Sequence, residues 1–214
     1  MDEQDRKFDR LETLLTEAKE ENGKLKKENI KLKEELSTFK ERVNQLEQRN
    51  RSDCVRVFDL PISGDSSDNT IVQSQLYQKL LLPILKGAKE NGQISVIPTV
   101  DETIEVAHIL PGQKHNKPVL CRFKSQRLKQ LIMRNKKDFA PRVNSSKGDR
   151  PGAYCYPVFD DVTRDTYSLM KRLGADDRVQ ASWFANGTIK YRLVDSETIL
   201  RARSTYGDYE DLFK

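Results

Sequence analysis

The chain has 214 residues, of which 36% are hydrophobic and 33% are charged, and its formal net charge is +5. This length allows one ordinary domain or two small ones, and the high charged fraction excludes a single deep core that takes in the whole chain. No apolar run approaches the length of a membrane span, and no signal peptide is recognised. Cys54, Cys121 and Cys155 are far apart in apolar stretches, which favours reduced thiols over disulfides or metal ligands. We therefore expect a protein of the cytoplasm or the nucleus, with no membrane partner.

The first fifty residues carry a heptad repeat of apolar side chains. Charged residues beside this seam pair attractively between parallel neighbours, as Glu21 does with Lys26. A helix that merely packs on a globular core would not need that charge pattern. The sequence therefore predicts a parallel coiled coil over residues 1–50. The residues predicted to associate are Phe8, Leu11, Leu15, Ala18, Asn22, Leu25, Asn29, Leu32, Leu36, Phe39, Arg42, Val43, Leu46 and Glu47.

Two features of this segment predict different numbers of chains in the coiled coil. Asn22 and Asn29 occupy core positions, where a buried amide fixes the register, and asparagine there with leucine at the other core position is common in dimers. Arg42 to Glu47 instead match the pattern Arg-h-x-x-h-Glu (h, hydrophobic), which is associated with three-stranded coils. We favour a trimer over a dimer.

Residues 51–143 are predicted to form a ferredoxin-like module of the RRM type, because their hydrophobic pattern gives the order β-α-β-β-α. A weak fourth strand is expected near residues 139–143, and the predicted first helix is capped by Ser67 or Asn69 and kinked at Pro83. The other predicted elements are a strand from Cys54, a first helix ending near Leu85, strands over 102–110 and 118–123, and a helix from Ser125 to about Lys137.

One face of this predicted sheet is open. Alternation places Arg56, Leu120 and Arg122 on that face, whereas the residues expected to point at the helices are Val55, Val57, Val119, Cys121 and Phe123. The aromatic residues that an RRM uses for stacking are missing at the usual places, since Arg56, Pro118 and Leu120 stand there. Binding is therefore expected to rest on phosphate contacts and guanidinium stacking, with weak sequence specificity.

Residues 111–150 contain 12 lysines and arginines and only two acidic residues, Asp138 and Asp149. Such a run is often a solvated surface that keeps a protein soluble. Here few acidic neighbours are present to pair with, and clustered like charges repel one another unless a partner supplies the opposite charge. We therefore interpret this segment as a polyanion-binding region.

Residues 144–152 are a Ser-, Gly- and Lys-rich linker, and residues 153–214 are predicted to form a small α+β C-terminal domain. Its expected elements are a strand over 153–159, a helix capped by Thr163 and ending near Gly174, and a hairpin. The hairpin joins 179–184 to 188–193 through Asn186-Gly187, a type I′ signal. A further helix is expected from Asp195 or Ser196, and the acidic tail 208–211 is expected to fray.

The chain resembles the RNA-binding protein encoded by the first open reading frame of LINE-type non-LTR retrotransposons. The resemblance covers nearly the whole chain: the heptads with core asparagines and the Arg-h-x-x-h-Glu motif, then the segments 55–61, 104–108 and 117–123, then the helix after residues 161–163 and the hairpin. A short coiled coil and a long segment between the first helix and the second strand suggest a distant branch or a domesticated relative.

This resemblance implies a trimer that coats its element's RNA into a ribonucleoprotein, with chaperone activity. Single strands would lie in a cleft between the RRM-like and C-terminal domains. By position, Arg122 matches the family's third-strand arginine, Lys171 and Arg172 lie at or beside its paired basic residues, and Arg178 matches the basic residue that enters the hairpin.

Together the residues and the resemblance predict a trimeric protein that binds single-stranded RNA, or single-stranded DNA, with little sequence preference. The alternative is a coiled-coil scaffold that presents α+β modules to an acidic protein. No catalytic constellation, cofactor motif or metal spacing is found, so we expect no enzyme, cofactor, metal or small-molecule substrate. The predicted nucleic-acid-binding residues are Arg56, Lys114, Lys117, Arg122, Lys124, Arg127, Arg134, Lys136, Lys137, Arg142, Lys171, Arg172, Arg178, Lys190 and Arg192.

Overall fold

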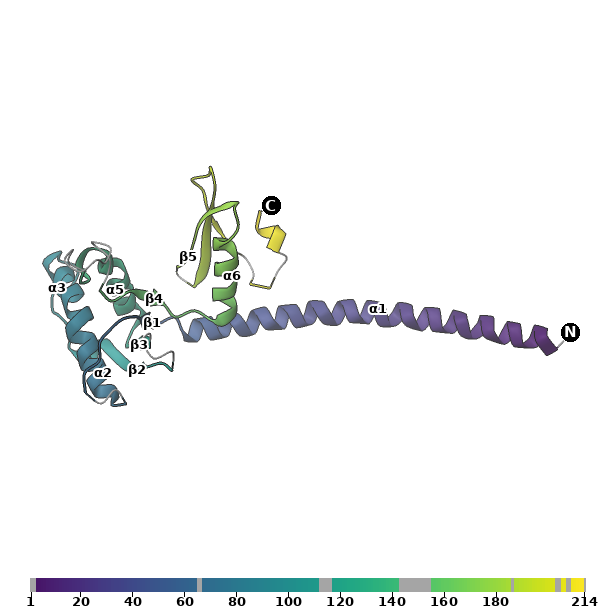
Figure 1. Cartoon of the computed structure of the whole chain (residues 1–214), viewed down its shortest axis with the longest axis horizontal. Coiled ribbons are helices and arrows are strands. Elements are labelled where there is room, and N and C mark those ends of the chain that lie inside the picture. Colours follow the sequence, from purple (N-terminus) through teal and green to yellow (C-terminus); the bar gives the residue numbers. More distant parts are fainter. Residues whose placement is uncertain are drawn as a thin grey trace. The chain divides into compact units, whose positions relative to one another are not determined.

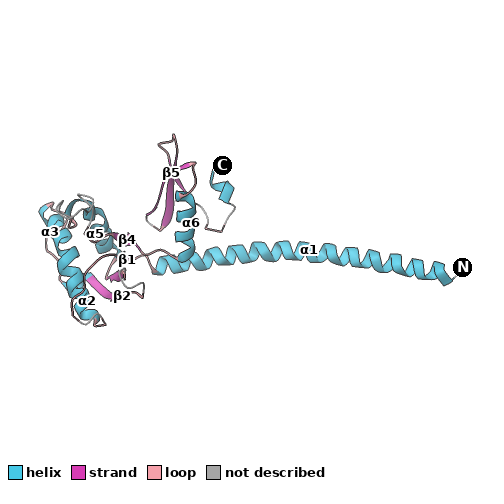
Figure 2. Cartoon of the chain, viewed as in Figure 1, coloured by secondary structure: helices cyan, strands magenta, loops and turns pink. Residues whose placement is uncertain are grey.

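The computed structural model describes residues 3–64, 67–111, 117–142, 155–185, 187–202, 205–206 and 209–213. Mixed α and β structure is present, with one long helix and antiparallel sheets (Figure 2). The chain divides into two compact units. One consists of Met1–Leu46 with Ala202–Lys214, and the other is Glu47–Arg201.

Helix α1 (Glu3–Asn50) runs through the whole heptad region (Figure 1). The segment is rich in Leu, Glu and Lys, which favour helix, and Gly23 is its one strongly disfavoured residue. The predicted helix is therefore confirmed. In the same unit, η3 (Tyr209–Phe213) is a short 3-10 helix that buries Tyr209, which stacks edge-on against Phe213. The prediction of a frayed tail is wrong for these residues, because an apolar ring anchors them.

A four-stranded antiparallel sheet with the strand order β2-β3-β1-β4 forms the centre of the second unit. Alternate residues of β1 and β3 point to one face, and Val55, Val57, Val119, Cys121 and Phe123 are at most 1% exposed there, as predicted. The strands are β1 (Cys54–Val57), β2 (Ile104–Ile109), β3 (Val119–Phe123) and β4 (Val158–Asp160).

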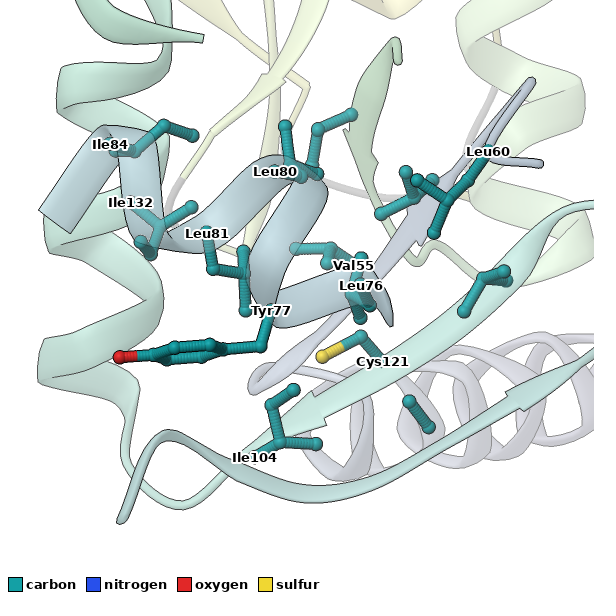
Figure 3. Close-up of a cluster of buried hydrophobic side chains, with 14 of the residues drawn as sticks. Val55, Leu60, Leu76, Tyr77, Leu80, Leu81, Ile84, Ile104, Cys121 and Ile132 are labelled. Atoms are coloured by element: carbon teal, nitrogen blue, oxygen red, sulfur yellow. The ribbon is translucent and has the colours of Figure 1, made fainter. Parts of the chain in front are cut away.

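Helices cover this apolar face of the sheet. Leu76, Leu80 and Leu81 meet Val55 and Cys121 in the core that Figure 3 shows. Burial raises the pKa of the Cys121 thiol, so this cysteine stays protonated. The helical segments are α2 (Asn69–Leu76), the π-helix η1 (Tyr77–Leu81), α3 (Leu82–Glu90), α4 (Val100–Thr103) and α5 (Gln126–Phe139).

Several predicted boundaries in this region are wrong. The first helix continues to Glu90 rather than Leu85, because Pro83 stands in the first turn of α3, where a missing N–H is harmless. Thr99 and Glu102 form a capping box, so Val100–Thr103 is helical and β2 starts later than predicted. The Ser125 cap of α5 is confirmed.

The fourth strand of the sheet is not at the described residues 139–142. Phe139 ends α5 instead, and the strand that pairs with β1 is Val158–Asp160, inside the segment that we had assigned to the C-terminal domain. The edge strand of the first sheet thus comes from a segment that follows the predicted linker 144–152 in the sequence. The linker itself and residues 153–154 lie outside the described residues.

A second, three-stranded antiparallel sheet with the order β5-β6-β7 follows helix α6 (Arg164–Gly174), which Thr163 caps as predicted. Its strands are β5 (Val179–Ala185), β6 (Thr188–Leu193) and β7 (Ile199–Arg201). The hairpin prediction is confirmed, with Gly187 at φ 78°, while Asn186 lies outside the described residues. The predicted last helix is wrong: Asp195, at φ 63°, turns the chain back, and Ile199–Arg201 pairs with β6.

Candidate functional site

The heptad seam of α1 is exposed in the single chain. Leu11 is 63% exposed, Leu32 is 56% exposed and Phe39 is 66% exposed, and Asn22 and Asn29 are exposed beside them. Leu15, Ala18, Leu25, Leu36, Val43, Leu46 and Glu47 are exposed as well, as is Arg42, and the Phe8 side chain lies outside the described part. An exposed apolar stripe of this length is unusual on the surface of a single folded chain.

A cavity of about 880 Å³ lies in the unit Glu47–Arg201. This volume falls in the range of about 300–1,000 Å³ that is usual for ligand pockets. Aromatic rings, two methionines and basic groups line most of it. The lining residues are Arg51, Arg56, Phe58, Met133, Lys136, Phe159, Asp160, Val162, Arg164, Tyr167, Met170, Ser182, Trp183 and Phe184.

Two phenylalanines bring rings to the open face of the first sheet. Phe159 of β4 stands opposite Arg56 of β1 and is 58% exposed. Phe58 follows Arg56 by two residues, and its ring packs edge-on against Phe159 at a centroid distance of 5.9 Å. The open face of the sheet therefore carries aromatic rings, which come from the end of β1 and from β4 rather than from the usual RRM places.

Asp161 holds two of the arginines that line the cavity. Its side chain is only 4% exposed, and its two oxygens accept from Arg56 Nε at 2.5 Å and from Arg51 Nη1 at 3.2 Å. A buried carboxylate needs such partners, since an unpaired charge is costly to bury. The side chains of both arginines remain 38% exposed, and each guanidinium group has further N–H donors that could bind an anion.

The end of α1 is joined to the start of α6 through Gln48. The buried Gln48 amide donates to the Asp161 carbonyl at 3.1 Å, and its oxygen accepts from the Thr163 backbone N–H at 3.0 Å. Thr163 is also the N-cap of α6, the helix that brings Arg164, Tyr167 and Met170 to the cavity. Gln48 therefore anchors the N-terminal end of α6, the helix that forms this wall of the cavity.

Lys136 supplies a cation beside a ring. Its Nζ donates to the Val158 carbonyl at 2.5 Å and lies 5.9 Å from the centroid of Phe159. Burial lowers the pKa of this ammonium group below the ordinary lysine value, and the nearby Asp160 carboxylate opposes that effect. An incoming phosphate would favour the charged form in the same way as Asp160 does.

Among the predicted nucleic-acid-binding residues that the structure describes, Arg56 and Lys136 are the two that line the cavity. Arg122 pairs with Glu105 at 3.3 Å, and Arg178 is held by both oxygens of Asp176. Residues on exposed surface are Lys117, Lys124, Arg127, Arg134, Lys137, Arg142, Lys171 and Arg172, whereas Lys190 and Arg192 are half-buried on β6. Lys114 lies outside the described residues.

Sequence reasoning missed Arg51, Arg164 and the aromatic lining. Phe58 could have been found, because it continues the alternation that put Arg56 on the open face. Phe159, Tyr167 and Trp183 carried no such signal, since their placement depends on β4 joining the first sheet.

Within the described residues, no helix is long and apolar enough to cross a bilayer. No cluster of three or more metal-ligating side chains is present in that part of the chain. No protein-family model and no curated protein matches this sequence.

Proposed function

We propose that this protein is a self-associating, single-stranded nucleic-acid-binding protein of the kind encoded by the first open reading frame of LINE-type retrotransposons. Copies associate in parallel through the α1 seam, as a trimer, and the cavity lined by Phe159 and Arg56 holds unpaired bases and their phosphates. In this proposal the protein coats an RNA into a ribonucleoprotein and acts as a nucleic-acid chaperone, as the resemblance implies.

The cavity carries the proposal. Unpaired bases stack on aromatic rings with a gain of about 1–3 kcal/mol per base, and arginine and lysine neutralise the phosphates between them. The cavity combines both kinds of group, with five aromatic side chains and four basic ones among its lining residues. A duplex hides the faces of its bases, so this chemistry favours single strands.

The first sheet supports an RRM-type assignment for the first module. Its antiparallel order β2-β3-β1-β4, with helices on one face, is the order expected of a βαββαβ module in which β1 and β3 are central. Such a module offers its free face to nucleic acid, and Arg56 and Phe159 stand on that face.

The α1 seam supports association. Burying a leucine side chain is worth about 1.5–3 kcal/mol, and the seam offers several leucines that are more than half exposed. Linked modules raise the effective concentration along one nucleic-acid strand, so association would also strengthen binding.

The test is binding of the full chain to a fluorescent 30-nucleotide RNA, followed by anisotropy at rising salt. We expect log-linear weakening with salt, nearly equal competition by mixed-sequence RNA, and weaker binding of a duplex. The chain has one tryptophan, Trp183, and it lines the cavity, so quenching of its emission should accompany binding.

The scaffold alternative makes the opposite prediction. If the basic surface serves an acidic protein, the RNA should not bind at micromolar protein and low salt, and Trp183 emission should not change. Sedimentation with and without the 30-mer would in either case show how many chains associate.

A further inference from the structure

The second sheet has a face turned away from α6. On the face toward α6, Ile189 and Tyr191 are buried, and the Ser182 hydroxyl donates to the Met170 carbonyl of the helix at 3.2 Å. The alternate residues must point the other way. Cross-strand pairing puts Trp183, Lys190 and Arg201 in one row of this outer face, and Ala181, Arg192 and Ile199 in the next.

This outer face is basic and carries one large ring. Lys190, Arg192 and Arg201 form no ion pair among the described residues, and the buried Nε of Arg192 has no hydrogen-bond partner there. Arg201 is exposed, and Ile199 beside it is 54% exposed. The nearest acidic residues in sequence, Asp195 and Glu197, are in the β6–β7 turn rather than in the two rows.

Trp183 connects this face to the cavity. It is one of the residues that line the cavity, and it is also the first residue of the row that continues through Lys190 to Arg201. Neighbouring strands are about 4.8 Å apart, so the row extends roughly 10 Å from Trp183 to Arg201. A row of this length is long enough for neighbouring phosphates of an extended single strand to meet different cations.

We propose that the outer face of the sheet β5-β6-β7 is a second contact surface for the same single strand, which leaves the cavity over Trp183 and places its phosphates on Lys190 and Arg201. The inference rests on the proposed function and extends it, because it assigns a path to the strand beyond the cavity. Charge complementarity selects the occupant: three cations without acidic partners fit a polyanion.

The experiment compares the full chain with the variant Lys190→Gln/Arg201→Gln on fluorescent single-stranded RNAs of 6 and 30 nucleotides. For single strands each lost phosphate contact lowers the salt slope by about 0.7, so two contacts lower it by about 1.4. The same relation gives a loss of up to about 25-fold at about 0.1 M salt. We expect this loss on the 30-mer and little change on the 6-mer, which the cavity alone accommodates.

A control with the same change of charge, Lys24→Gln/Lys27→Gln, removes two exposed lysines from α1 and should leave the 30-mer slope near that of the wild type. A second variant, Ile199→Lys, adds a cation to the exposed end of the other row and should steepen the slope by about 0.7. That gain could not come from a folding defect.

The outcomes separate the two proposals. If the wild type fails to bind the 30-mer at low salt, the proposed function falls and this inference falls with it. If the wild type binds but the Lys190→Gln/Arg201→Gln and Ile199→Lys variants keep its slope and affinity, the strand does not cross this face, while the cavity proposal stands.

Discussion

Arg56 and Asp161 offer the sharpest test of how the cavity is built, because they form a buried ion pair and Arg56 is also a proposed RNA-binding residue. Arg56→Ala leaves the buried Asp161 carboxylate with Arg51 alone. Breaking a buried ion pair costs about 3–5 kcal/mol. Here the Arg56 side chain is 38% exposed and water screens part of its charge, so we expect a loss of about 1–3 kcal/mol.

Adding Asp161→Asn to Arg56→Ala removes the stranded charge and should recover part of that stability. The coupling energy from the double-mutant cycle should fall within about 1–3 kcal/mol. Urea denaturation at one fixed protein concentration, followed through Trp183 emission, gives the four free energies of unfolding. RNA affinity should not recover in the double variant, since the arginine is still missing.

Two results would refute this reasoning. Additivity within about 0.5 kcal/mol would mean that the two side chains are not energetically coupled. Full recovery of RNA binding in the double variant would mean that Arg56 acts only through the fold, and it would then leave the set of binding residues.

Three further predictions concern the seam, the helix packing and the cavity lysine. Leu25→Glu/Leu32→Glu should reduce the sedimentation mass to that of one chain, because two carboxylates would enter the buried seam; an unchanged mass would exclude this seam as the interface. Gly87→Ala should destabilise the fold by about 1–3 kcal/mol in urea, since the new Cβ would lie 2.2 Å from a ring carbon of α5. Gly23→Ala has nothing within 4 Å and should stabilise α1 by about 1 kcal/mol. Because the pKa of Lys136 is lowered, this lysine should lose its charge, and RNA binding should weaken, as the pH rises through that lowered value toward 10.5. Lys136→Arg should remove this pH dependence, since arginine stays charged. Identical pH profiles of the wild type and the variant would contradict a role of Lys136 in RNA binding.

The local elements were predictable wherever a short-range signal fixed them. Ser125 and Thr163 cap helices as their sequence context predicts, and alternation placed Val55 and Val57 in the core. What failed depended on long-range pairing. The sequence patterns of residues 139–143 and of Val158–Asp160 are both compatible with a strand, and only the pairing with β1 shows that Val158–Asp160 is the edge strand.

The same limit applied to the cavity. A charge count along the sequence finds lysines and arginines, but it cannot find which of them have carboxylates within reach. Arg178 and Arg122 were predicted from position, and each faces an acidic partner, Asp176 or Glu105. Arg51 was missed because it follows the heptads directly, where the sequence indicated only the end of a helix.

Helix α1 uses different sides for its different contacts. The seam positions, such as Phe39 and Leu46, are exposed, whereas the buried polar residues Asn44 and Gln48 occupy heptad positions on the outer side. Asn44 donates to the Thr205 hydroxyl at 3.0 Å within its own unit, and Gln48 holds the start of α6 in the other. Among the described residues, these contacts within a chain leave the seam side chains exposed, so association through them would not compete with the packing that builds the cavity. A variant that loses the seam should in consequence keep the cavity, and its affinity for a 6-nucleotide RNA should match that of the wild type even when its affinity for a 30-mer falls.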